Sequence, residues 1–304
     1  MTLVPRAIKR PRKTFAKTGS LAWLTFPALL FFLTFAALPL LGVVVLSFMN
    51  WDGIGAITWA GLTNWISLLQ DPVTGSSLWI TILVVLLSVL VQGPISLLLG
   101  VFSAGRQKYR AVLSVLYFIP LLLSSAAVAI AFLSLLDPNF GLSAGLGLPF
   151  LKQNWLGEPG LAMGVVIFVL AWQHIPFHTL IYQGGVRQIP ASLYEAAELD
   201  GANRIQQFFQ ITLPQLKYTV ITSTTLLVVG SLTYFDLIFV LTGGGPGYAT
   251  RVLPLQMYLT GFRSNDMGAA SAYGVILAFL GLTLALILQR LGGKSRQSSQ
   301  LEGQ

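Results

Sequence analysis

The sequence predicts an all-α integral membrane protein with six transmembrane helices. Two observations lead to this fold class. Hydrophobic residues make up 55% of the chain and charged residues only 9%, whereas soluble domains average about 45–50% and about 25%. The apolar residues are also gathered into six stretches, each near the length of about 20 residues that a helix needs to cross a bilayer.

The six stretches are continuous apolar runs, which predict helices and not the alternating strands of a membrane barrel. Lipid offers no hydrogen bonds to the backbone, so a spanning segment must satisfy its own polar groups. A helix does this within a single segment. We expect the spans at residues 22–48, 78–102, 111–136, 161–183, 218–242 and 270–290.

The first apolar stretch, from Leu21 to Phe48, follows a basic segment and so resembles a signal peptide. It is longer than the apolar core of a secretory signal, which has roughly 7–15 residues, and we expect it to be retained as the first membrane helix. The chain then divides into a polar N-terminal tail at 1–18, a membrane domain at 19–291 and a polar C-terminal tail at 292–304. No second soluble domain is expected.

Lysine and arginine are distributed unevenly between the two sides of the predicted membrane domain. Fifteen of the 18 lie near the two termini and in the connections 103–110 and 184–217, whereas only Lys152, Arg251 and Arg263 lie in the opposite connections. Cytoplasmic loops carry such an excess of basic residues. Both termini and the 184–217 connection are therefore predicted to be cytoplasmic. The net charge of +8 follows from insertion, and we expect membrane lipid, not nucleic acid, as the surrounding partner.

Several chemistries lack the residues that they need. The chain has no cysteine, which excludes disulfides, thiolate zinc sites and iron–sulfur clusters. It has two histidines and no cluster of Asp, His and Glu for a membrane-embedded enzyme. Gly293-Lys294-Ser295 resembles the end of a P-loop, but Leu288 stands where G-x-x-x-x-G-K-[ST] requires glycine. We therefore expect no catalytic, metal or cofactor site, and no ATP hydrolysis by this chain.

The longest cytoplasmic connection, 184–217, predicts two short helices joined by a bend. Ser192 and Glu195 form an S-x-x-E pattern, which is typical of a capping box at the start of a helix. Gly201 is placed to end this helix in a left-handed conformation. A second helix is expected from about Asn203.

The second helix is expected to run to about Thr212 and to carry an apolar side made by Ile205, Phe208 and Phe209. Amphipathic helices of this kind dock onto another protein or lie among lipid headgroups. The low basic content of the loop argues against headgroups, because membrane-surface helices are usually rich in Lys and Arg.

Three parts of the sequence resemble the permease subunits of bacterial ABC importers. The EAA motif of those subunits is matched by Glu195-Ala196-Ala197, Asp200-Gly201-Ala202 and Ile211-Thr212-Leu213-Pro214. The segment FDLIFVLTGGGP at 235–246, and Phe262 followed by MGAASA at 267–272, resemble the carbohydrate branch, the maltose and glycerol-3-phosphate type. The resemblance extends from Leu21 to Arg290 and points to the inner-membrane components of binding-protein-dependent transport.

The resemblance implies the type I ABC importer permease fold, in which the cytoplasmic loop fits a cleft on an ATPase subunit. It implies that Glu195 pairs with a basic residue of that ATPase and that Gly201 forms the bend between two coupling helices. The residues that it assigns to coupling are Glu195, Ala196, Ala197, Asp200, Gly201, Ala202, Ile211, Leu213 and Pro214.

The resemblance also implies a set of partners and a place of action. The partners are a second, non-identical permease, two copies of an ATPase subunit that use ATP and Mg²⁺, and an external solute-binding protein. The place is the plasma membrane of a bacterium, and the function is import of a sugar by alternating access. A di- or oligosaccharide is expected, with glycerol-3-phosphate open. The spans hold no basic residue to bind a phosphate, which favours a neutral sugar.

Asp236 is the one acidic residue well inside a predicted span. Intramembrane ionisable residues are candidates for function, and Tyr234 lies beside it. Asp236 is expected either to line the substrate pathway or to hold the glycine-rich turn that follows it. A secondary transporter, the main alternative function, would need several such charges for ion coupling.

His174 and His178 are four residues apart on the fourth predicted span. This spacing suits a metal ion, but no acidic neighbour accompanies them and Pro176 lies between them. Two other roles remain open for the pair. They line a polar cavity together with Gln173, or they form hydrogen bonds between helices.

Overall fold

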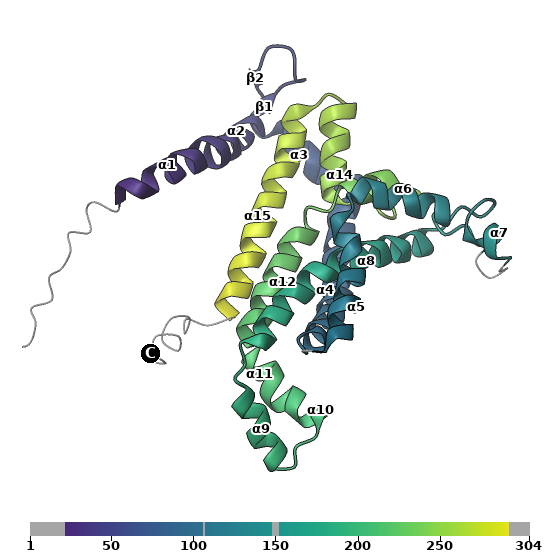
Figure 1. Ribbon diagram of the computed structural model, residues 1–304. Helices are drawn as coiled ribbons and strands as arrows, with labels where there is room; N and C mark the ends of the chain where they lie inside the picture. The colour runs from purple at the N-terminus through teal and green to yellow at the C-terminus, as the bar shows by residue number, and fades with distance from the viewer. Residues whose placement is uncertain (1–21, 106, 148–151, 292–304) are drawn as a thin grey trace, which may run out of the picture.

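The computed structural model describes residues 22–105, 107–147 and 152–291. Within these ranges the regular secondary structure is helical apart from one short antiparallel hairpin. In this hairpin β1 (Met49–Asn50) pairs with β2 (Thr58–Trp59), and Met49 lies opposite Trp59. The all-α class is confirmed, with the hairpin at the end of the molecule opposite α9 (Ala191–Leu199) (Figure 1). The predicted tails, 1–18 and 292–304, lie outside the described residues.

Four helices in the described ranges are long and apolar enough to cross a membrane: Thr25–Leu46, Pro72–Ser103, Pro159–Val186 and Met267–Leu291. They correspond to the first, second, fourth and sixth predicted spans. The first comprises α1 (Ala22–Phe32), a π-helical turn (Leu33–Ala37) and α2 (Leu38–Leu46); the others are α4 (Pro72–Ser103), α8 (Pro159–Arg187) and α15 (Met267–Leu291). A bent pair of helices raises the number to five if it is taken as one span.

That bent pair replaces the third predicted span, and the expectation of one helix over 111–136 is wrong. The structure has α5 (Lys108–Leu122) and α6 (Ser125–Leu135), which meet at 97°. Leu123 and Ser124 between them have extended backbones, and Ser124 Oγ accepts a hydrogen bond of 3.2 Å from the backbone N–H of Ala127. The serine therefore starts a new helix instead of continuing the old one.

The fifth predicted span, 218–242, is also interrupted. It consists of α12 (Lys217–Ser231) and α13 (Asp236–Leu241), with a break over Leu232–Phe235. The hydroxyl and the backbone N–H of Thr233 both donate to the carbonyl of Gly230, at 2.8 and 3.0 Å. These bonds close the end of α12, and neither helix reaches spanning length alone. Six continuous spans are therefore not found among the described residues.

The centre of the bundle is the pair α4 and α8, which lie against each other along much of their length. The contact face of α4 includes the buried small residues Ser96 and Gly100. A Cβ at Gly100 would lie 2.4 Å from Tyr182 Cβ of α8, so only glycine permits this approach. Small residues at helix contacts are typical of membrane proteins, because they let backbones pack closely.

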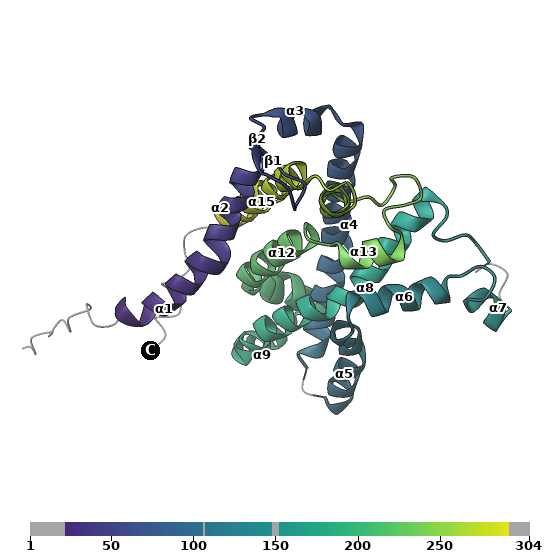
Figure 2. The ribbon, with the colours of Figure 1, turned by 90° about the horizontal axis from the view of Figure 1, so that it is seen from above.

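The remaining helices surround this pair. α12 packs beside α15, α4 and α8, and α13 crosses onto α6 (Figure 2). α14 (Leu253–Tyr258) and the π-helical turn after it (Leu259–Arg263) pack on α15. The short helices α3 (Thr63–Gln70) and α7 (Leu142–Leu146) lie in the connections.

The first spanning segment differs from the rest because α2 packs on α15 whereas α1 projects away from the bundle (Figures 1 and 2). Every described side chain of α1 is exposed, including Trp23, Phe31 and Phe32. An apolar surface of this extent needs lipid or another membrane subunit to cover it.

Candidate functional site

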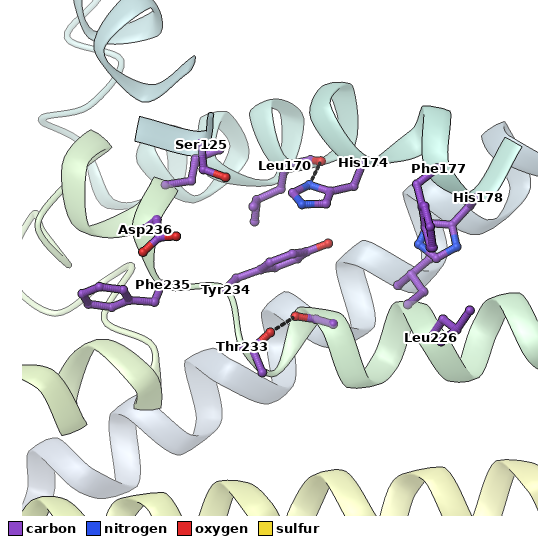
Figure 3. A pocket seen from close by; sticks show the side chains of 13 residues that line it. Ser125, Leu170, His174, Phe177, His178, Leu226, Thr233, Tyr234, Phe235 and Asp236 are labelled. Atoms are coloured by element: carbon purple, nitrogen blue, oxygen red, sulfur yellow. Dashed lines mark hydrogen bonds between the residues drawn. The ribbon is translucent and has the colours of Figure 1, made fainter. Parts of the chain in front are cut away.

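A cavity of about 300 Å³ lies between α8, α12 and α13, with one residue contributed by α6. The histidines of α8 and the residues of the α12–α13 break meet there, as Figure 3 shows. Its polar groups are those of Ser125, His174, His178, Thr233, Tyr234 and Asp236. Among the described residues, no lysine or arginine lines it.

The break between α12 and α13 places Tyr234 in this cavity. Because α12 ends at Ser231, the next residues leave the helix and the Tyr234 ring turns toward α8. Its centroid lies 4.9 Å from that of the His174 ring. The Tyr234 side chain lies beside the fully buried Gln92 of α4.

The two histidines are held by different partners. His174 Nδ1 is 3.0 Å from the carbonyl oxygen of Leu170 in its own helix, and His178 Nδ1 is 3.0 Å from Ser223 Oγ of α12. Both histidines line the cavity, and His178 also forms a hydrogen bond between two helices. Both roles that the sequence left open therefore occur in this pair. In the described part of the chain, no three His, Cys, Asp or Glu side chains come together as metal ligands.

Asp236 is the first residue of α13, and its side chain is exposed at the cavity. It does not cap the helix, because the N-cap position is taken by Phe235 without a side-chain bond. The carboxylate makes no hydrogen bond with another described residue. It is therefore available to a ligand that offers hydroxyl or ammonium donors.

Gln173 lies outside this cavity. It is buried, and its Nε2 donates a hydrogen bond of 3.0 Å to the carbonyl oxygen of Leu123, at the bend between α5 and α6. The structure therefore separates Gln173 from His174 and His178, with which the sequence grouped it. The cavity also includes Ser125 and Thr233, which sequence reasoning did not single out. Both adjoin helix breaks that the apolar pattern did not indicate.

The 184–217 connection forms two short helical segments at the far end of the molecule from the hairpin (Figure 1). The first is α9 (Ala191–Leu199); the second comprises α10 (Arg204–Gln207), a π-helical turn (Phe208–Thr212) and α11 (Leu213–Gln215). Gly201 between them has a φ of +79°, and a Cβ there would meet nothing within 4 Å. Its left-handed backbone favours glycine for conformational reasons, not for lack of space.

The expected capping box of Ser192 and Glu195 is wrong. Pro190 occupies the N-cap position of α9 without a side-chain bond, so the helix starts earlier and both residues lie within it. A capping box occurs instead at the second helix, where Asn203 and Gln206 each accept a hydrogen bond from the other's backbone N–H, at 2.9 and 2.8 Å.

The loop presents an exposed surface that combines charged and apolar groups. Glu195 and Asp200 are exposed on α9 and at its end, and Leu199 is 90% exposed beside them. Ile205 and Phe209 are also exposed on the second segment. Large apolar side chains at this level of exposure are typical of a contact surface for another molecule.

Residues 96–297 match the family of binding-protein-dependent transport system inner membrane components. The chain belongs to this family. The matched region contains α8, the α9–α11 loop, the residues that line the cavity and α15.

Curated relatives extend the similarity over most of the chain. A probable ABC transporter permease, YurN of Bacillus subtilis, is 35% identical over 268 residues, which cover 86% of this chain and 91% of the relative. The arabinooligosaccharides transport system permease AraP of the same organism is 30% identical and covers 88% and 87%. Among solved structures, a subunit of a bacterial alginate ABC transporter superposes with a TM-score of 0.78 at 22% identity, covering 90% of this chain and 94% of that one. That likeness establishes the fold.

Proposed function

We propose that this inner membrane component forms one half of the pathway of an ATP-driven sugar importer, and that its cavity contacts the sugar. The cavity carries this proposal. It places hydroxyl, imidazole and carboxylate groups beside the Tyr234 ring, and sugars are bound by such polar groups together with an aromatic face. It lies within the helical bundle and not on a loop.

The class of sugar follows from the charges at the cavity. Asp236 supplies a carboxylate, and no Lys or Arg in the part of the chain that the structure describes lines the site. A phosphorylated or acidic sugar would need cationic partners, so a neutral di- or oligosaccharide is the favoured substrate. The relatives support a saccharide in general, since AraP is named for arabinooligosaccharides.

The α9–α11 loop is proposed to couple this pathway to an ATPase subunit. Glu195 is exposed and helical, and Gly201 allows the sharp bend that separates the two segments. Binding of the loop in a cleft on the ATPase, with Glu195 paired to a basic residue there, would let ATP-driven closure reorient the membrane helices. Coupling then means that the ATPase states bind the inward- and outward-facing forms with different affinity.

The single loop in this chain can serve only one ATPase subunit. A machine with two ATPase subunits therefore needs a second permease, and the exposed apolar surface of α1 is available for lipid or for that partner. We propose an assembly of this chain, one non-identical homologous permease and two ATPase subunits that use ATP and Mg²⁺. A solute-binding protein docks on the outer loops.

The proposed location is a bacterial plasma membrane, with both termini in the cytoplasm. Because the chain has no cysteine, single cysteines introduced at Ser20 and Ser298 report this directly. Neither should react with an impermeant thiol reagent added to intact cells. Labelling of either cysteine from outside would show that the terminus carrying it does not lie in the cytoplasm and would contradict the proposed orientation.

Co-purification tests the proposed function most simply. A tagged chain, expressed with its genomic neighbours and extracted in mild detergent, is expected to bring down an ATPase and a second permease. The Glu195→Ala chain should recover less ATPase but the same amount of permease. A monodisperse chain that binds no ATPase would contradict the proposal and favour a stand-alone transporter.

A further inference from the structure

A second hollow continues the cavity along the same pair of helices. This groove, of about 370 Å³, is lined by Ile181 and Gly184 of α8, by Gln188 directly after α8, and by Thr219 and Thr222 of α12, among others. It lies toward α9, because α8 leads into α9 and α12 follows α11. The groove offers hydroxyl and amide groups, which form hydrogen bonds with sugars.

The residues of both hollows follow helical spacing on both helices. On α8 the cavity has His174, Phe177 and His178, and the groove continues one turn later at Ile181. On α12, running the other way, the groove has Thr219 and Thr222, and the cavity follows with Leu226 and Gly230. Side chains three and four residues apart share one face of a helix, so both hollows lie on one seam between α8 and α12.

Two apolar side chains stand where the cavity ends and the groove begins. Phe177 and Leu226 line the end of the cavity that is farthest from Asp236, as Figure 3 shows. They are 43% and 46% exposed, so they project into the seam and are not part of the packed core. Apolar side chains placed between two polar spaces oppose the passage of water and polar solutes when they close against each other.

His178 contacts one of these two side chains, Phe177. Its ring lies edge to face with the Phe177 ring, with centroids 5.2 Å apart and planes at 83°. The same imidazole is within 3.0 Å of Ser223 Oγ, and both residues are buried, at 4% and 1% exposure. A single side chain therefore joins α8 to α12 and supports Phe177.

We propose that Phe177 and Leu226 form this chain's half of a gate in the sugar path, that His178 positions it through Ser223, and that the groove beyond it is the exit subsite. The proposal rests on the proposed function for the nature of the solute. Opening the gate requires α8 and α12 to move relative to each other. Both helices lead directly into the coupling loop, so movement of the loop reaches the gate.

The gate can be tested without knowing the sugar. A Cβ at Gly230, in the cavity, or at Gly184, in the groove, would meet nothing within 4 Å, so single cysteines fit at both positions of this cysteine-free chain. The reaction of Gly230→Cys and Gly184→Cys with an impermeant thiol reagent is measured in inside-out membrane vesicles that contain the whole complex. The measurement is made without nucleotide and with nucleotide trapped by vanadate.

Gly184→Cys is expected to react quickly in both conditions, and Gly230→Cys several-fold more slowly in at least one. Adding Phe177→Ala should remove that protection. Phe168 is an exposed phenylalanine of the same helix that lines neither hollow, so Phe168→Ala should not change the protection of Gly230→Cys. Ser223→Ala should reduce the protection in part. Ser231→Ala removes a hydroxyl that bonds only within α12, and it should not reduce the protection.

Two results would overturn the gate. One is a Gly230→Cys rate equal to that of Gly184→Cys in both conditions. The other is protection that Phe177→Ala leaves intact, which would mean that a packed helix of the partner permease covers the seam. Protection that depends on Phe177 but not on nucleotide would support the gate and contradict its coupling to ATP. Failure of the gate proposal and failure of the proposed function therefore give different results.

Discussion

Tyr194 Oη and Thr212 Oγ1 lie 2.8 Å apart, and this hydrogen bond ties α9 to the π-helical turn that leads back to the membrane. Thr212 is buried, whereas most of α9 is exposed. The bond therefore fixes α9 to the segment that leads into α12.

Tyr194→Phe removes this bond and keeps the ring. A hydrogen bond of this kind contributes about 1 kcal/mol, so the loop should be loosened without unfolding the chain. We expect transport to fall while the complex still assembles, so that more ATP is hydrolysed per sugar moved. Tyr248→Phe, which keeps the ring against Arg251 in the connection between α13 and α14, serves as the control. An unchanged ratio of ATP to sugar for Tyr194→Phe would show that the bond has no role in coupling.

Glu195→Ala should lower transport and substrate-stimulated ATPase activity together, without affecting insertion, because the residue is exposed on a short helix. The measurements are uptake, ATPase rate and membrane yield of the same preparation. Normal uptake by this variant would remove the central residue of the coupling proposal.

Gly201→Val should be more severe than Glu195→Ala. A β-branched residue strongly resists the φ of +79° found there, and a strained backbone of this kind costs roughly 1–3 kcal/mol. Gly201→Asn should be milder, since asparagine tolerates the left-handed region. Both variants are compared by uptake rate. Equal activity of the Val and Asn variants would show that the bend does not depend on backbone conformation.

Asp236→Ala should weaken the apparent affinity for sugar, measured as the KM of uptake. A hydrogen bond to a charged group contributes about 1.5–3 kcal/mol, which corresponds to a rise in KM of roughly ten- to a hundredfold. Glu158→Ala is the matched control, because this acidic residue precedes α8 without capping it. A KM within experimental error of the unaltered chain would place Asp236 outside the substrate pathway.

Gln173→Leu should affect stability and not affinity. The substitution leaves the Leu123 carbonyl without its hydrogen bond, and an unsatisfied buried acceptor costs about 1–3 kcal/mol. The thermal midpoint of the purified complex should fall while the KM of uptake stays constant. A raised KM with an unchanged thermal midpoint would instead show that Gln173 contributes to the substrate pathway.

The sequence predicted the positions of four spanning helices because their apolar runs exceed the length that a bilayer requires. It did not reveal the breaks at Leu123–Ser124 and Leu232–Phe235. Both stretches are apolar on either side, and the interruptions depend on single hydroxyl groups, Ser124 Oγ and Thr233 Oγ1, that bond to the backbone locally. Hydropathy carries no information about such bonds.

The cavity was predictable only in part for the same reason. His174, His178, Tyr234 and Asp236 are rare polar residues in apolar stretches, so each could be noticed from the sequence. That they share one cavity follows from the break that turns Tyr234 toward α8. Gln92 is a comparable polar residue in the second span, but only the packing of α4 places it beside Tyr234.

The most direct test of the central claim is transport by the purified assembly in proteoliposomes. This chain, its partner permease, the ATPase subunits and the solute-binding protein are reconstituted together. Accumulation of radiolabelled neutral oligosaccharide is followed with ATP, with a non-hydrolysable analogue and with an ion gradient alone. We predict accumulation with ATP only, and its loss with Glu195→Ala. Accumulation driven by an ion gradient without ATP, in an assembly that lacks any ATPase, would contradict the account.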